Sequence, residues 1–233
     1  MESAGNAGAG GEVEMNRLVV FDFDGTLADT GSGITKSAQY ALDQMGWPHY
    51  ETDRLGFFVG PPLNDSFMRL GMNEEEALRA VALFRERYAA RGKLEFEIYP
   101  GIPELLRQMK EVGMRLGMAT SKPETFAREI AGHGGFLNWF DYISGNSMND
   151  EERVSSKADR IRDVLEKSGC LDQRDHVIMV GDRKFDIAGA KEFGVRAVGV
   201  AYGYGDRKEL EEAGAERIFD TVEELSDYLL HNP

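Results

Sequence analysis

The spacing of hydrophobic and polar positions changes along the chain. A short, continuous apolar run begins at Leu18 and stops at Asp24, as a buried strand does where it enters a loop. Residues 33–91 show helical spacing instead, interrupted by a Gly-Pro-Pro sequence at 60–62. After residue 101 helical and strand-like segments alternate. This alternation predicts an α/β fold with a doubly wound, mainly parallel sheet.

The same changes of pattern predict three parts. Residues 1–15 are small and Gly/Ala-rich, so we expect a flexible leader outside the fold. Residues 16–30 and 96–233 are expected to form the α/β core, and residues 31–95 an inserted all-helical unit. The length of 233 residues suits a core domain with a smaller insert.

Composition and charge narrow the classes of protein. Hydrophobic residues make up 42% and charged residues 29%, as in globular proteins, and no apolar run approaches the roughly 18 residues that cross a bilayer. Cys170 is the only cysteine, so no internal disulfide is expected and we predict a cytoplasmic protein without a membrane partner. The net charge of -14 opposes binding to a nucleic-acid polymer, whereas a small anionic substrate is compatible with a locally positive cleft.

Polar side chains follow the predicted strands. Ligands of doubly wound sheets bind beyond the carboxyl ends of the strands, so these positions are candidates for a site. In an extended chain residues two apart project to one side, which predicts that Asp22 and Asp24 face one ligand. The acidic, hydroxyl and basic residues at the strand ends and at one helix start are Asp22, Asp24, Thr120, Ser121, Lys122, Lys157, Asp182 and Asp186.

Several carboxylates at one sheet edge need a cation. Two unit charges about 4 Å apart repel by roughly 4 kcal/mol at an effective dielectric constant near 20. Carboxylates without a His or Cys cluster favour a hard ion, and Mg²⁺ is the one that commonly shares its ligands with phosphate. By itself the Asp22/Asp24 pair is more typical of a solvated turn, and Asp182 could be only a helix cap. The presence of a second acidic pair downstream, Asp182 and Asp186, favours a Mg²⁺ site over a solvated turn or a helix cap.

These residue types suit phosphoryl transfer. Phosphate monoesters hydrolyse extremely slowly, so several groups must act together. A carboxylate nucleophile divides the displacement into two steps, while a metal, a lysine and a hydroxyl neutralise the phosphate oxygens. A second acid can protonate the leaving oxygen and later deprotonate water, and Asp24 is placed for both tasks.

Four ordered motifs resemble the haloacid dehalogenase (HAD) superfamily, in its phosphoglycolate phosphatase-like and 5′-nucleotidase-like branch. They are FDFDGTLADT, MATSKP, SSKAD and VGDRKFD, and the resemblance extends from about Asn16 to Leu230. It implies a HAD-like, Rossmann-like core whose helical insert is a cap over the site. Many relatives have proline directly after the lysine of the third motif, where this chain has Ala158.

The resemblance also implies roles for residues. Asp22 resembles the nucleophile, Asp24 the acid/base, Thr120 the phosphate hydrogen-bond donor and Lys157 the cation beside the nucleophile. Asp182 and Asp186 resemble the metal-holding pair, and in the family Asp22 and the backbone carbonyl of Asp24 also bind the metal. Lys122 is the rival of Lys157, and Ser121 of Thr120.

Further candidates for phosphate or substrate binding surround these motifs. Cap loops of relatives hold specificity determinants, and a simple turn is the alternative for the Gly-Pro-Pro bend. The candidates are Gly25, Thr26, Ser121, Lys122, Arg54, Phe58 and Asn64.

We therefore expect a Mg²⁺-dependent phosphatase that hydrolyses a small, phosphoglycolate-like phosphate monoester through an aspartyl-phosphate on Asp22, as a monomer or homodimer. A 5′-nucleotidase and a β-phosphoglucomutase-like phosphomutase are alternatives within enzymes. A receiver-like signalling protein is the alternative outside them, opposed by the chain length, the helical insert and Asp24. Dehalogenation is opposed by the predicted metal-binding acids.

Overall fold

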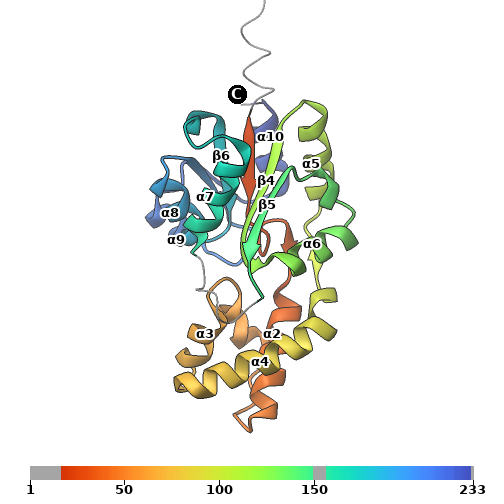
Figure 1. Cartoon of the computed structure of the whole chain (residues 1–233), viewed down its shortest axis with the longest axis vertical. Helices are drawn as coiled ribbons and strands as arrows, with labels where there is room; N and C mark the ends of the chain where they lie inside the picture. Colours follow the sequence, from red (N-terminus) through yellow and green to blue (C-terminus); the bar gives the residue numbers. More distant parts are fainter. Residues whose placement is uncertain (1–16, 149–155, 232–233) are drawn as a thin grey trace, which may run out of the picture.

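The computed structural model describes residues 17–148 and 156–231, and the predicted leader at residues 1–15 lies outside this range. Six parallel strands form the main sheet, in the order β5-β4-β1-β6-β7-β8 (Figure 1). The strands are β1 (Leu18–Phe21), β4 (Arg115–Pro123), β5 (Tyr142–Asn146), β6 (Val177–Gly181), β7 (Arg196–Val200) and β8 (Ile218–Phe219). The predicted α/β fold with a parallel sheet is confirmed, although the two-residue strand β8 was not predicted.

Strand β1 shows why the sheet is covered on both faces. All four of its residues are fully buried, and successive side chains point to opposite faces. Val19 and Phe21 belong to one apolar cluster, and Leu18 and Val20 belong to the other. The continuous apolar run at this position is therefore the pattern of a central parallel strand.

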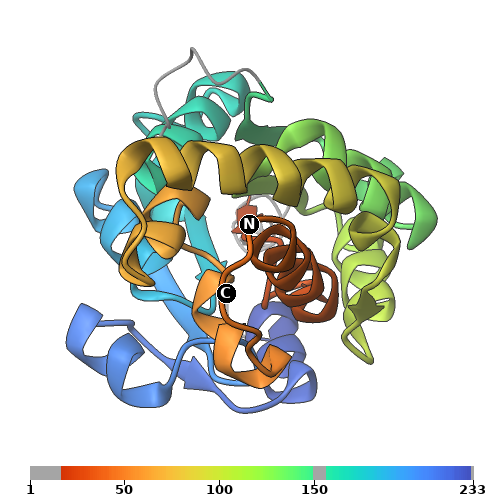
Figure 2. The ribbon, with the colours of Figure 1, turned by 90° about the horizontal axis from the view of Figure 1, so that it is seen from below.

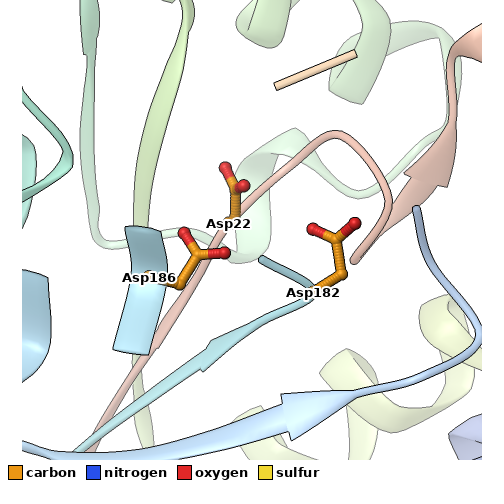
Figure 3. A group of neighbouring side chains, drawn as sticks. All are labelled: Asp22, Asp182 and Asp186. Atoms are coloured by element: carbon orange, nitrogen blue, oxygen red, sulfur yellow. The ribbon is translucent and has the colours of Figure 1, made fainter. Parts of the chain in front are cut away.

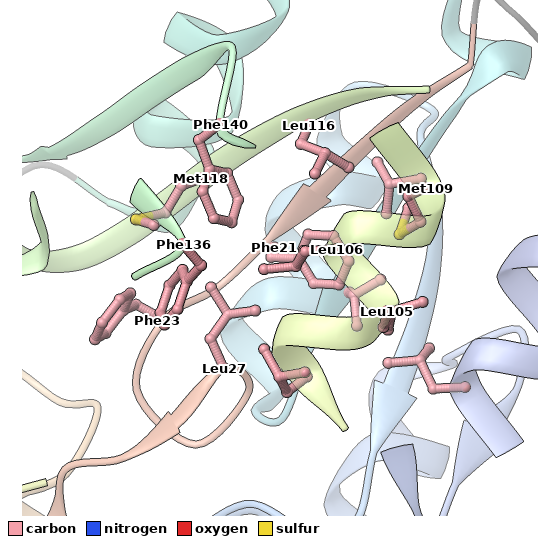
Figure 4. Close-up of a cluster of buried hydrophobic side chains, with 14 of the residues drawn as sticks. Phe21, Phe23, Leu27, Leu105, Leu106, Met109, Leu116, Met118, Phe136 and Phe140 are labelled. Carbon is pink, nitrogen blue, oxygen red and sulfur yellow. The ribbon is translucent and has the colours of Figure 1, made fainter. Parts of the chain in front are cut away.

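Each face of the sheet is packed by three helices. The larger cluster (Figure 4) joins the sheet to α5 (Ile102–Glu111), α6 (Glu124–His133) and α10 (Val222–His231). The cluster on the opposite face includes α7 (Lys157–Ser168), α8 (Lys184–Glu192) and α9 (Arg207–Ala213). Short 3₁₀ turns occur at η3 (Leu137–Trp139) and η4 (Arg174–His176).

Helices from the residue range 31–94 lie at the end of the core toward which the strands run (Figure 1), and Figure 2 shows α4 crossing this end. They share a third apolar cluster of their own, here called the helical-segment cluster. The elements are α2 (Gly31–Gln44), η1 (Thr52–Phe58), α3 (Leu63–Arg69), α4 (Glu74–Ala90) and η2 (Gly92–Leu94). The division into a core and an inserted unit at 31–95 stays a proposal.

Two short strands connect the helical segment to the core. Strand β2 (Ala28–Asp29) pairs antiparallel with β3 (Glu97–Ile98), so the chain leaves and re-enters the core at adjacent points. Because β1, β4 and β6 are parallel, their carboxyl ends all face the helical segment (Figure 1). Within the described residues, no helix is long and apolar enough to span a membrane.

Candidate active site

Strand β1 delivers the first carboxylate to the carboxyl edge of the sheet. The backbone N–H of Asp22 donates to the carbonyl oxygen of Val180 in β6 at 2.9 Å, which fixes the end of β1. The Asp22 carboxylate accepts a hydrogen bond from the backbone N–H of Phe23 at 2.7 Å. Gly25 then adopts a φ of 81°, a left-handed conformation that turns the chain away from the strand.

Asp22, Asp182 and Asp186 form one carboxylate group (Figure 3). Each offers one oxygen, and these oxygens all lie within 4.8 Å of one another. Asp182 follows β6 and Asp186 lies in the first turn of α8, and both are fully buried. The structure thus brings together three acids from two distant parts of the sequence.

Lys157 is the cation of this group. Its ammonium lies 2.6 Å from Asp22 Oδ1 and 2.9 Å from Asp186 Oδ1. It also donates to the carbonyl oxygen of Ala119 at 3.1 Å, which ties it to strand β4. Lys157 therefore contacts two of the three carboxylates. When all three are ionised, its single charge leaves two negative charges of the group uncompensated.

Burial and mutual repulsion change the proton affinities of the group. Burial raises the pKa of Asp22 from 3.8 to about 6, against the opposing effect of Lys157. Burial also raises the pKa of Asp182 well above its ordinary value, and the charge of Asp186 adds to the shift. Burial alone would lower the pKa of Lys157, but its two carboxylate partners hold it above its ordinary value.

The donor set fits a divalent metal ion. All three side chains supply carboxylate oxygens, the ligands that hard cations such as Mg²⁺ prefer. Asp186 Oδ1 is buried and makes no hydrogen bond within the described residues, although it faces Lys157. A divalent cation would match the two uncompensated charges and would favour the ionised carboxylates.

Asp24 has its own cation. Lys122 Nζ donates to both Asp24 oxygens, at 2.8 and 3.0 Å, and the hydroxyl of Thr30 also donates to Asp24. The ring of Tyr88, from helix α4, lies 5.0 Å from the Lys122 ammonium. The two rival lysines thus have different partners: Lys157 contacts Asp22, and Lys122 contacts Asp24.

The second motif forms the wall beside these pairs. Thr120 is buried, and its hydroxyl accepts from the backbone N–H of Lys122 at 3.1 Å. The carbonyl of Ser121 accepts from the side-chain amide of Asn146 at 2.8 Å. In the first motif, the hydroxyl of Thr26 donates to Asp182 at 3.3 Å. Among these hydrogen bonds, that of Thr26 reaches the carboxylate group directly, whereas those of Thr120 and Ser121 shape the loop at the end of β4.

The three candidates in the helical segment have different environments. Arg54 is exposed, and the side-chain amide of Asn64 contacts the sulfur of Met68 at 3.8 Å. Phe58 is 1% exposed and packs on Phe67 with ring centroids 4.8 Å apart. Its ring belongs to the helical-segment cluster, which argues against the substrate contact predicted for it.

Two residues beside the site were not assigned a role from the sequence. Arg183 donates to the carbonyl oxygen of Val59 at 2.9 Å and to Glu209 at 2.9 Å, so it connects the core to the Gly-Pro-Pro bend. Tyr204 binds the start of helix α2 through its hydroxyl. Tyr204 follows strand β7, and the strand-end rule applied to that strand would have indicated it.

Comparisons with known proteins agree with this geometry. The family model for haloacid dehalogenase-like hydrolases matches residues 19–200. A 5′-nucleotidase of Pseudomonas aeruginosa is 42% identical over 82% of this chain and 86% of that protein. The tyrosine-protein kinase PtkA of Mycobacterium tuberculosis is 38% identical over 82% of this chain and 64% of that protein.

More distant relatives include phosphoglycolate phosphatase 1 of Pseudomonas aeruginosa, 29% identical over 90% of this chain and 78% of that protein. The crystal structure of a predicted phosphatase from Clostridium acetobutylicum matches with a TM-score of 0.84 and 39% identity, over 92% of this chain and 98% of that one. The range matched by the family model includes all three members of the carboxylate group, Asp22, Asp182 and Asp186. The chain therefore belongs to the haloacid dehalogenase-like hydrolases.

Proposed function

We propose that this protein is a Mg²⁺-dependent phosphatase that hydrolyses small phosphate monoesters with Asp22 as the nucleophile. The observation that carries the proposal is the carboxylate group of Asp22, Asp182 and Asp186, with Lys157 2.6 Å from Asp22. A buried carboxylate next to a metal site and a lysine has the surroundings that attack on a phosphate requires.

Asp22, Asp182 and Asp186 would hold the ion through their side chains, and the family resemblance adds the backbone carbonyl of Asp24. When bound, Mg²⁺ supplies positive charge to the phosphate oxygens and favours the ionised form of Asp22. Lys157 adds a second positive charge beside Asp22. The hydroxyl of Thr120 would donate to a phosphate oxygen. It accepts from the backbone N–H of Lys122, so its own proton stays available for this hydrogen bond.

In the first step an Asp22 oxygen attacks phosphorus, and the bond from phosphorus to the ester oxygen breaks. Asp24, in its protonated form, gives its proton to the leaving oxygen, and the phosphoryl group stays on Asp22 as an acyl phosphate. In the second step Asp24 takes a proton from water, whose oxygen attacks phosphorus, and Asp22 and inorganic phosphate are released. Lys122 and Thr30 orient Asp24 for both proton transfers.

Nucleoside 5′-monophosphates are the first candidate substrates. The relative that bears the name 5′-nucleotidase is 42% identical to this chain, whereas phosphoglycolate phosphatase 1 is 29% identical. This order reverses the one expected from the motifs, and phosphoglycolate becomes the second candidate, supported by several phosphoglycolate phosphatases that cover about 90% of the chain.

Phosphate release from a panel of metabolites tests the proposal. The panel contains nucleoside 5′-monophosphates, phosphoglycolate and sugar phosphates, each with Mg²⁺ and with a chelator. Mg²⁺-dependent release is expected, and Asp22→Asn should lower kcat by roughly 10³-fold or more because the nucleophile is lost. Asp172→Asn, an exposed acid, is the matched control. Metal-dependent turnover retained in Asp22→Asn, or no release from any substrate, would refute the proposal.

A further inference from the structure

Tyr204 contacts both the carboxylate group and the helical segment. It lies in the loop that follows β7, and its backbone N–H donates to Asp182 Oδ2 at 2.8 Å. Its side chain packs against the helical-segment cluster. A single residue of the core therefore touches a candidate metal ligand with its backbone and the inserted helices with its ring.

The hydroxyl of Tyr204 hydrogen-bonds to the backbone at the start of helix α2. It accepts from the backbone N–H groups of Thr30, at 2.8 Å, and Gly31, at 2.7 Å, and it donates to Asp29 at 2.6 Å. The first N–H groups of a helix have no partner within the helix, and the side chain of the N-cap residue usually accepts from one of them. Here the N-cap residue, Thr30, makes no such bond, because its hydroxyl donates to Asp24. Tyr204 instead supplies an acceptor for the N–H groups of Thr30 and Gly31, and Gly31 shares its N–H with Asp29 Oδ1 at 2.9 Å.

Close packing of two glycines makes this arrangement possible. A Cβ atom on Gly25 would lie 2.1 Å from Asp182 Oδ2 and 2.6 Å from the ring of Tyr204. A Cβ atom on Gly203 would lie 2.3 Å from the carbonyl oxygen of Gly25. Contact this close leaves little freedom for Asp182 and Tyr204 to move independently.

A continuous series of hydrogen bonds thus runs from Asp182 to the Tyr204 backbone, and from the Tyr204 hydroxyl to Thr30, whose side chain binds Asp24. We propose that Tyr204 is a positioning residue that couples metal binding at Asp182 to the placement of the start of α2 and, through Thr30, to the orientation of Asp24. The inference rests on the proposed function for the role of the metal site.

The coupling has a physical cause in the geometry of Asp182. A cation that binds the Asp182 carboxylate fixes the oxygen that accepts from the Tyr204 backbone, and so restricts the position of the Tyr204 hydroxyl. A fixed hydroxyl makes stronger hydrogen bonds to the first turn of α2. Because linkage is reciprocal, a well-formed start of α2 must in turn strengthen metal binding by the same factor.

Amide hydrogen exchange with and without Mg²⁺ tests this coupling. In the wild-type protein Mg²⁺ should slow exchange at the backbone amides of Thr30 and Gly31 by about fivefold, the effect of one typical hydrogen bond. Tyr204→Phe keeps the ring and the backbone N–H but removes the hydroxyl acceptor, so exchange at the Thr30 amide should become faster and insensitive to Mg²⁺. The Gly31 amide keeps its second acceptor, Asp29 Oδ1 at 2.9 Å, so its exchange should become faster by a smaller factor. Tyr202→Phe is the matched control in the same loop, because the Tyr202 hydroxyl donates to the Thr26 carbonyl and does not contact α2.

Calorimetric titration of Mg²⁺ gives the reciprocal measurement. Tyr204→Phe should bind Mg²⁺ about fivefold more weakly than the wild type, while Tyr202→Phe should keep the exchange response at α2. The coupling is refuted if Mg²⁺ binds the wild type without slowing these amides, or if Tyr204→Phe keeps the full response.

These outcomes are distinct from failure of the proposed reaction. Mg²⁺-dependent exchange without phosphate release from any substrate would refute the hydrolysis and leave the coupling standing. Absence of Mg²⁺ binding in the calorimeter would refute both the metal site and the coupling.

Discussion

At the residue scale the carboxylate group is costly to the folded protein in the absence of a cation. Asp182 is fully buried, and burial together with the neighbouring Asp186 raises its pKa. Asp182 accepts hydrogen bonds from Tyr204 and Thr26, which offset part of the cost. Residues that bind a metal are often placed at the expense of stability, and removing their charge tends to stabilise the protein.

We predict that Asp182→Asn raises the melting temperature of the metal-free protein by roughly 2–6 °C, because it removes a buried like charge. With Mg²⁺ the order should reverse, since the wild type gains binding energy that the variant lacks. Differential scanning calorimetry in chelator and in Mg²⁺ measures both effects, and Asp172→Asn should leave the melting temperature nearly unchanged in each. A lower melting temperature for Asp182→Asn in chelator would contradict the prediction.

The raised pKa of Asp22 predicts a pH dependence of stability. Burial raises this pKa from 3.8 to about 6 in the folded state, so between these values the folded protein binds a proton that the unfolded chain has released. The contribution of Asp22 to the free energy of unfolding is therefore greatest below about pH 4 and declines as the pH rises to about 6.

Urea unfolding of the metal-free wild type and of Asp22→Asn between pH 4 and pH 7 measures this contribution. The difference in unfolding free energy between the two proteins should fall by on the order of 3 kcal/mol across that range, because only the wild type has the Asp22 carboxyl that titrates there. A difference that stays constant or grows with pH would show that the pKa of Asp22 is not raised.

The sequence predicted the residue types of the carboxylate group better than it predicted the environments of other candidates. The carboxylates Asp22, Asp182 and Asp186 were indicated by their places at strand ends, and the structure brings them together. The burial of Phe58 could not be predicted from the sequence, because it depends on packing against Phe67 and against helices from other parts of the chain. The catalytic roles themselves stay predictions.

At the element scale helix α7 shows how local sequence places a functional side chain. Ser156 accepts from the backbone N–H of Asp159, and the Asp159 side chain accepts from the backbone of Ser156. This capping box fixes the first turn of the helix. Lys157 is the first residue of that turn, so the box also fixes the backbone from which the ammonium reaches Asp22.

We predict that Ser156→Ala costs about 1 kcal/mol of stability and also lowers kcat, because the backbone of Lys157 becomes less restricted. Asn73→Ala is the matched control, since Asn73 and Glu76 form the same type of capping box at the start of α4. It should cost a similar free energy, about 1 kcal/mol, with a much smaller effect on kcat. Denaturant unfolding and steady-state kinetics separate the two effects, and equal losses of kcat in both variants would contradict the role given to the α7 cap.

The sequence predicted the bounds of helices and strands where these depend on residues close together in the chain. The apolar run at 18–21 and the break at residue 101 correspond to β1 and to the start of α5. Strand β8 contains only Ile218 and Phe219, too few residues to show a periodic pattern, and it forms by pairing with β7. Strand β4 extends to Pro123, with an irregular register against β5 between Ala119 and Pro123.

At the scale of the whole molecule the helical segment is joined to the core through adjacent connections. Ala28 pairs with Ile98, and Asp29 pairs with Glu97, so the two segments that flank the helical segment lie side by side. The carboxylate group and Lys157 belong to the core alone. Phe126 and Tyr204 are core residues that pack in the helical-segment cluster.

This arrangement predicts that a short Gly-Ser linker in place of residues 31–95 leaves a core that unfolds cooperatively and still binds Mg²⁺. We expect its free energy of unfolding to be about 3–6 kcal/mol lower than that of the whole protein, the cost of exposing two aromatic side chains. Calorimetry and chemical unfolding test both expectations. A core without a cooperative transition would show that residues 31–95 are not an inserted unit.

The sequence by itself determined the alternating α/β pattern, the motifs and the residue types of the site, because strand burial, turns and helix caps depend on neighbours close in the chain. The family resemblance already implied Lys157 beside Asp22, and the structure pairs them. Only the tertiary structure decided that Lys122 pairs with Asp24. Only it placed the Tyr204 hydroxyl on the first turn of α2. These contacts join residues more than 90 positions apart, and their partners are set by the order of the strands in the sheet and the packing of helices on it.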